Sequence, residues 1–188
     1  MLIIYAHPNK EGHCGYFLEK VKEDLIKREI DFEVLDLYDM KYDPVLRGEE
    51  HYTSGHHYVS EENKIIQEKI AKNKRFVIIY PVWWNNMPAI LKGFFDRIMV
   101  KGFAFEYRQK MPIGLLKGRV AIFVSRGSPR IFSITIGAGR SVKVLIKDIL
   151  RFCGLRAKAF PVGMATKFTD KNREMIEKQV VKGLDYLR

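Results

Sequence analysis

Three short segments of the sequence carry the side chains best suited to chemistry. They are residues 7–15 (HPNKEGHCG), 81–86 (PVWWNN) and 125–130 (SRGSPR). In the first, His7, Gly12 and His13 precede a helical pattern, and a helix that begins there offers unpaired N–H groups and the positive end of its dipole to a phosphate-sized anion. The segment lacks both GxGxxG and GxxxxGK[ST], which disfavours a dinucleotide fingerprint and a P-loop. The alternative is a turn with incidental histidines.

The second segment is suited to a planar ligand. A flat, mostly apolar molecule with a polar edge needs aromatic walls and backbone polar groups at its rim, and Trp83 and Trp84 with Asn85 supply both. Two tryptophans at the carboxyl end of a strand therefore suggest a flavin. The alternative is that one of the two indoles only covers the hydrophobic core.

The third segment combines small residues with a cation. Ser125, Gly127 and Ser128 let the backbone come close to a ring or a ribityl chain. Arg126 suits the electron-rich N1 to C2=O edge of a reduced flavin, or else points to solvent. We predict no metal site, since the remaining histidines have no carboxylate or cysteine at ligand spacing; they are His51, His56 and His57.

The elements that position these segments follow from the hydrophobic pattern. Short apolar runs at 2–5, 76–80 and 120–124 are typical of strands buried on both faces, whereas 31–38 and 157–162 alternate and fit edge strands. Helical patterns of apolar residues lie between the strands and after the last one. This alternation predicts an α/β, doubly wound sheet of five parallel strands in the flavodoxin-like order 2-1-3-4-5, with helices on both faces. The three segments then meet at the carboxyl ends of the strands.

Length and composition limit the function classes. The 188 residues fit one domain spanning the chain, and the net charge is +11, with 33 Lys plus Arg against 22 Asp plus Glu. The basic residues are spread along the chain without a recognition motif, so we expect no nucleic-acid partner. No apolar stretch is long enough for a membrane span or resembles a signal peptide. Two cysteines are too few for a disulfide framework, which favours the cytoplasm.

The sequence resembles the NAD(P)H:quinone oxidoreductase family, the flavodoxin-like group that includes the DT-diaphorases and the potassium-efflux ancillary proteins. The most specific match is YPVWWNNMPAILKGFFDR at 80–97 followed by GFAFEY at 102–107, close to the pattern P-x-x-W-x-x-x-P-A-x-L-K-G-x-x-D-R and G-F-A-[YF]. AHPN at 6–9 and FCGL at 152–155 are also similar, whereas SRGSP at 125–129 follows T-T-G-G-P only loosely.

The resemblance implies which residues hold a flavin. The phosphate would be bound by His7, Gly12, His13 and Cys14; the ring by Pro81, Val82, Trp83, Trp84 and Asn85; and the pyrimidine side by Ser125, Arg126, Gly127 and Ser128. It also implies a homodimer in which Phe105 and Tyr107 of one subunit line the partner's pocket, with Phe152 and Phe132 as further pocket residues. Related quinone reductases carry a Tyr and a His after the third segment. Residues 131–139 here contain Phe132 and no histidine, so the sequence leaves the identity of the electron acceptor open.

The implied reaction passes hydride from NAD(P)H to the flavin and then to a small-molecule electron acceptor. FMN is favoured over FAD, because no extension after the last helix would hold an adenosine. The rival from another class is a regulatory flavoprotein that binds a transporter.

Overall fold

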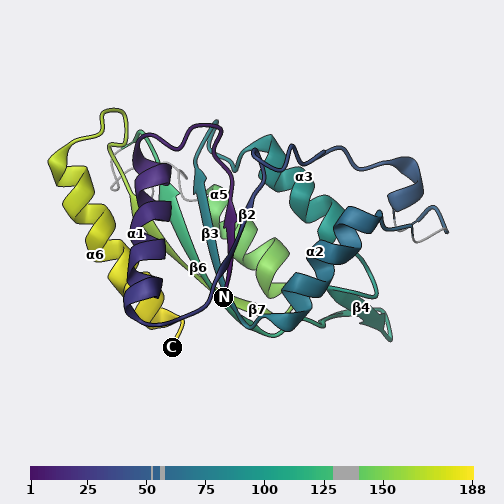
Figure 1. Cartoon of the computed structure of the whole chain (residues 1–188). Helices are drawn as coiled ribbons and strands as arrows, with labels where there is room; N and C mark the ends of the chain where they lie inside the picture. Colours follow the sequence, from purple (N-terminus) through teal and green to yellow (C-terminus); the bar gives the residue numbers. More distant parts are fainter. Residues whose placement is uncertain (52, 56–57, 129–139) are drawn as a thin grey trace.

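A computed structural model of the chain describes residues 1–51, 53–55, 58–128 and 140–188. Its centre is a twisted parallel sheet with helices on both faces (Figure 1). The strands of this sheet are β1 (Leu2–Tyr5), β2 (Glu33–Asp36), β3 (Arg75–Pro81), β6 (Gly118–Ser125) and β7 (Leu155–Val162). They pair in the order β2-β1-β3-β6-β7, which is the 2-1-3-4-5 order predicted from the apolar runs. The predicted fold class is therefore confirmed.

Helices cover the sheet in the places that the periodic patterns indicated. They are α1 (His13–Lys27), α2 (Glu61–Lys72), α3 (Ala89–Ile98), α5 (Arg140–Val144), which continues as a π-helical turn at Leu145–Arg151, and α6 (Asp170–Tyr186). Ser60 caps α2 and Thr169 caps α6, since each side chain accepts a hydrogen bond from the backbone N–H three residues later. In the described part of the chain, no helix is both long and apolar enough to cross a membrane.

Alternation along the strands divides the core into two layers. In β1, Ile3 and Tyr5 pack with α1 and α6, while Leu2 and Ile4 face the layer formed with α2, α3 and the π-helical turn. Because successive side chains point to opposite faces, one strand serves both layers. The sheet is thus held from both sides, and its carboxyl edge is a rigid support for loops.

A small antiparallel hairpin, not predicted from the sequence, lies outside this sheet. It consists of β4 (Phe105–Arg108) and β5 (Met111–Gly114). The N–H of Leu116, just before β6, donates to the carbonyl of Cys153, just before β7, at 2.9 Å. The hairpin therefore lies at the amino ends of these strands, which Figure 1 shows as the end opposite the loops after β1, β3 and β6.

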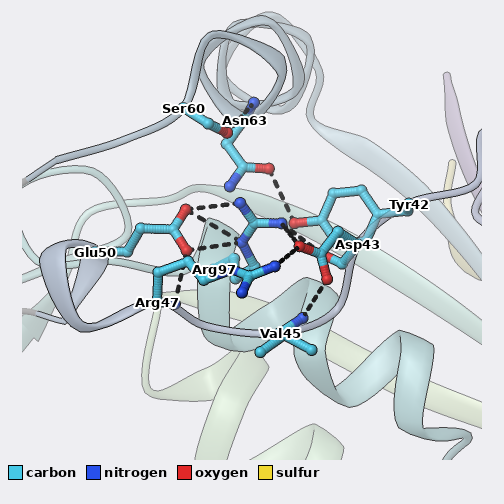
Figure 2. A network of polar contacts seen from close by, with 8 residues as sticks. All are labelled: Tyr42, Asp43, Val45, Arg47, Glu50, Ser60, Asn63 and Arg97. Atoms are coloured by element: carbon cyan, nitrogen blue, oxygen red, sulfur yellow. Dashed lines mark hydrogen bonds and ion pairs between the residues drawn. The ribbon is translucent and has the colours of Figure 1, made fainter.

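A polar network ties the long segment between β2 and α2 to α3 (Figure 2). Arg97 of α3 and Glu50 of the short 3-10 helix at Gly48–Glu50 are both buried, and Arg97 Nη2 donates to Glu50 Oε1 at 2.8 Å. Arg97 Nε donates to the two carboxylate oxygens at 3.1 and 3.0 Å. Nearby, the Tyr42 hydroxyl donates to Asn63 Oδ1 of α2 at 2.9 Å.

Candidate functional site

The carboxyl ends of β1, β3 and β6 enclose a cavity of about 260 Å³. It lies where the order of a doubly wound sheet reverses, the usual ligand site of such folds. Its wall is made of the following described residues: His7, Glu11, Gly12, His13, Cys14, Pro81, Val82, Trp83, Ser125, Arg126, Gly127 and Ala165. The three segments selected from the sequence thus converge on one cavity.

The loop after β1 folds back over the first turn of α1. The Tyr5 hydroxyl donates to the carbonyl of Asn9 at 3.1 Å, and the Asn9 side chain accepts from the N–H of Glu11 at 2.7 Å. Gly12 has a φ of 91°, and a Cβ on Gly15 would lie 1.5 Å from the carbonyl oxygen of Lys10. Only glycine permits this close approach, so the loop conformation depends on the two glycines.

Lys10 anchors the same loop to the segment that follows β2. Its Nζ lies 3.1 Å from Asp36 Oδ2 and also pairs with Asp39. Asp36 in turn accepts from the N–H groups of Tyr38 and Asp39, both at 3.2 Å. The loops after β1 and β2 are therefore held together at the cavity's side of the sheet.

The N-terminus of α1 opens on the cavity. Its first intrahelical hydrogen bond runs from Tyr16 N–H to the Gly12 carbonyl at 2.9 Å, so the N–H groups of the three residues before Tyr16 have no carbonyl partner within the helix. Among the described residues no side chain caps this end, unlike the capped ends of α2 and α6. The helix therefore presents open donors and a positive dipole end to an anion.

The two histidines of this loop have different surroundings. His7 is part-exposed, and its ring centroid lies 5.7 Å from that of Trp83, which links the loops after β1 and β3. His13 packs edge-on against Phe168 at 5.0 Å between centroids. Burial lowers the pKa of His13, although contacts with Asn172 and Lys167 oppose this. Neutral imidazole is thus favoured at His13, so this histidine adds little positive charge to that of the helix end.

Cys14 joins the first and third loops. Its Sγ lies 3.2 Å from Ser125 Oγ, and both side chains are buried. Burial raises the pKa of the Cys14 thiol to about 12, although the contact with Ser125 acts in the opposite direction. The protonated thiol is a poor nucleophile, so Cys14 contributes packing and a hydrogen bond to the cavity floor.

The segment after β3 forms a tight turn that separates its two tryptophans. Trp83 N–H donates to the Asn86 carbonyl at 2.9 Å and Asn86 N–H donates back at 2.8 Å. Between them Trp84 and Asn85 have φ values of 50° and 55°, the geometry of a type I′ turn. Trp83 is 39% exposed and lines the cavity, whereas Trp84 is 100% exposed and does not.

Arg126 is fixed at the carboxyl end of β6. Its N–H donates to the Val162 carbonyl at 3.0 Å, and its carbonyl accepts from Ala165 N–H at 2.9 Å. The residue is only 6% exposed and lines the cavity. The alternative that Arg126 points to solvent is therefore wrong.

Some predicted residues lie away from the cavity. Trp84, Asn85 and Ser128 are close in sequence but outside its wall. Phe105 contacts Phe152 at 5.0 Å and Tyr107 at 5.8 Å between ring centroids, at the hairpin end of the sheet. Phe132, like His56 and His57, lies outside the described residues. Within the described ranges, no group of His, Cys, Asp and Glu has the arrangement of a metal site.

The sequence reasoning missed two residues of the wall. Glu11 belongs to the first loop, and its place beside Gly12 could have indicated that it reaches the cavity. Ala165 follows β7, and the adjacency of β7 to β6 could have indicated that this loop also reaches the cavity.

The fold and the position of the cavity define a class, the α/β proteins with the flavodoxin-like fold. A comparison with protein families agrees, since the model of the family described as flavodoxin-like fold matches residues 1–183, and the chain belongs to that family. Among curated proteins it is 30% identical to an uncharacterized NAD(P)H oxidoreductase of Haemophilus influenzae over 181 residues, 94% of this chain and 90% of the relative.

Solved structures extend the likeness. The chain is similar to Smu.1420 from Streptococcus mutans UA159, with 29% identity, a TM-score of 0.86 and 98% coverage of both chains. It is also similar to the NAD(P)H:quinone oxidoreductase from Methanothermobacter marburgensis, with 25% identity, a TM-score of 0.87, and coverage of 100% of this chain and 96% of that one. The predicted family is thus confirmed, and the chain is an oxidoreductase of this group. These relatives give no support to the regulatory alternative.

Proposed function

We propose that the protein is a flavin-dependent oxidoreductase that takes reducing equivalents from NAD(P)H and passes them to a small-molecule electron acceptor such as a quinone. The observation that most supports this is the convergence of three loops on one cavity at the carboxyl ends of β1, β3 and β6. The names of two relatives, NAD(P)H oxidoreductase and NAD(P)H:quinone oxidoreductase, suggest the electron donor and the acceptor class.

The residues present fit a flavin. The open N–H groups of α1 and the positive end of its dipole suit the phosphate tail. Trp83 supplies an aromatic surface for the ring, and Pro81 and Val82 supply apolar contact beside it. A single helix end suits the one phosphate of FMN, which we therefore propose in preference to FAD.

In this proposal the residues of the protein bind the flavin and orient it, and the flavin carries out the electron transfer. When bound, a flavin supplies the two-electron chemistry by accepting hydride from the nicotinamide and passing it to the acceptor. Trp83 would hold the ring in place, and the backbone at Ser125 and Gly127 would border it. Cys14 stays protonated, so no thiolate competes for the acceptor. We assign no general base, because hydride transfer needs none.

We also propose that two copies complete each site. Phe105, Tyr107 and Phe152 lie at the hairpin end of the sheet, opposite the cavity of their own chain. These aromatic residues therefore reach a cavity only if it belongs to a second copy. Tyr107, Met111 and Ile113 leave the hairpin with exposed apolar surface, as expected of a segment that a partner covers.

The test is the identity of the cofactor. Purified protein should be yellow, and the small molecule released by denaturation should have the absorption spectrum and mass of FMN. Reconstituted protein should oxidise NADH or NADPH in the presence of quinones. Release of FAD would correct the cofactor, and colourless protein that binds neither added FMN nor FAD would contradict the proposal.

A further inference from the structure

The described residues that line the cavity include one carboxylate side chain, Glu11, and one guanidinium, Arg126. Arg126 is buried, whereas Glu11 is exposed. Water and salt weaken the field of an exposed carboxylate, but they weaken that of a buried guanidinium much less. The potential inside the cavity is therefore positive on the side of the third loop.

The position of this charge is fixed by the fold. The backbone at Arg126 is tied to Val162 and Ala165 by hydrogen bonds of 3.0 and 2.9 Å, so it is anchored to the end of β7 as well as to β6. Its neighbour Ser125 pairs with Pro81 in the sheet and accepts from Val82 N–H at 2.8 Å. These bonds anchor the backbone, and the 6% exposure of Arg126 confines its side chain to the cavity wall. A charge already in place costs little reorganisation when a ligand changes its own charge.

The buried side chain of Tyr80, on the adjacent strand β3, does not cancel this charge. Its hydroxyl has no hydrogen-bond partner among the described residues. Burial raises the pKa of Tyr80 well above its usual range, and the positive charge of Arg126 opposes that rise only in part. Tyr80 is thus a neutral phenol near a cation and does not itself offset the positive charge of Arg126.

We propose that Arg126 stabilises the reduced form of the cofactor over the oxidised form and so raises the reduction potential of the bound flavin. Hydride from NAD(P)H brings two electrons and one proton, so the neutral oxidised ring becomes an anion while the nicotinamide leaves oxidised. A fixed positive charge lowers the free energy of that anion and leaves the neutral form almost unaffected. The inference rests on the proposed function, and it gives Arg126 an electrostatic role that needs no direct contact.

The test compares wild-type protein with Arg126→Gln, which removes the charge, and Arg126→Lys, which keeps it. For each, the dissociation constant of oxidised FMN is measured by titration, and the reduction potential of bound FMN is measured against a reference dye. Together they give the ratio of affinities for reduced and oxidised FMN. In wild-type protein this ratio should exceed one, and Arg126→Gln should lower it about tenfold or more, or about 30 mV for a two-electron couple. Arg126→Lys should retain most of the ratio.

Several results would overturn the inference. A wild-type potential at or below that of free FMN would do so even if both variants failed to fold. An unchanged potential in folded Arg126→Gln would do the same. If the variant instead weakened oxidised FMN but not riboflavin, Arg126 would be a phosphate ligand. A wild-type protein that binds no flavin would contradict the proposed function itself, which separates the two failures.

Discussion

Trp83 and Trp84 are adjacent in sequence but differ in exposure and in their relation to the cavity. The type I′ turn sends the Trp83 ring towards His7 and leaves Trp84 fully exposed. The indole that faces the cavity can stack on a ligand, whereas the other contacts only solvent within one chain. This difference supplies a matched pair of substitutions.

We expect Trp83→Ala to weaken binding of FMN by about 1 to 3 kcal/mol, or roughly five- to 150-fold, because a ring-stacking wall is lost. Trp84→Ala should leave the affinity nearly unchanged. Titration of apoprotein with FMN, followed by flavin fluorescence, measures both. If the two variants lost the same affinity, the cavity as described would not be the flavin site.

The sequence could not say which tryptophan faces the cavity. That choice depends on positive φ at Trp84 and Asn85, and only asparagine of these two favours such a conformation. The same holds for Arg126, whose burial depends on hydrogen bonds to Val162 and Ala165 from a distant strand. The residue types were enough to predict where the site lies, but the directions of its side chains depend on tertiary contacts that the sequence does not reveal.

At the scale of elements, the segment between β2 and α2 depends on the ion pair between Glu50 and Arg97 (Figure 2). Both side chains are buried, and the arginine belongs to α3, the helix that follows the tryptophan turn. Removing Glu50 leaves the buried Arg97 charge with only the Asp43 carboxylate, 3.9 Å from Nη1, and the Asp43 carbonyl. That loss is costly, whereas replacing both Glu50 and Arg97 is much less so.

We expect Glu50→Ala to lower the free energy of unfolding by about 3 to 5 kcal/mol and Glu50→Ala with Arg97→Met to lower it by less. Urea denaturation of the single and double variants measures the difference. The control is Glu174→Ala, which removes a carboxylate from an exposed pair with Lys178 and should change little. A double variant less stable than Glu50→Ala would show that the pair is not what holds the segment.

Helices and strands were predicted correctly where the hydrophobic periodicity of the sequence matches the packing in the core. The element type and its position in the chain are both indicated by the apolar runs of β1, β3 and β6 and by the helical pattern of α1. The hairpin was missed because its turn has Gln109 and Lys110 at positive φ, without the Asn-Gly or Gly signal of a hairpin, and because Pro112 argues against a strand. It forms because Gly114 packs against the backbone of Gly154, where a Cβ would be 2.2 Å from a nitrogen.

At the scale of the whole molecule, the proposed dimer predicts that one subunit binds the flavin and that the hairpin of the other contacts the electron donor and acceptor. Phe105→Ala with Tyr107→Ala should leave the flavin bound but lower kcat/KM about tenfold or more, because these side chains would contact the electron donor and acceptor in the partner's site. Stopped-flow reduction by NADPH, followed by reoxidation with quinones, separates the two half-reactions. Ile26→Ala, which removes an exposed apolar side chain from α1, is the control.

The proposed assembly would be contradicted if the protein sedimented as a monomer at the concentrations of the assay and still turned over normally. Fast reduction with slow reoxidation by every quinone would retain the enzyme class and remove the quinone as acceptor. The absence of histidine from residues 131–139 makes that comparison informative.

The two outer strands of the main sheet limit how copies can meet. Among the described residues β7 pairs with β6 alone, and it carries Arg156 and Lys158 exposed along its length with Pro161 near its end. Charged side chains and proline on a free edge oppose the addition of another strand, since an incoming chain would meet like charges or lose a hydrogen bond. Copies of this protein therefore cannot readily join their sheets through β7, and strand addition at this edge is disfavoured.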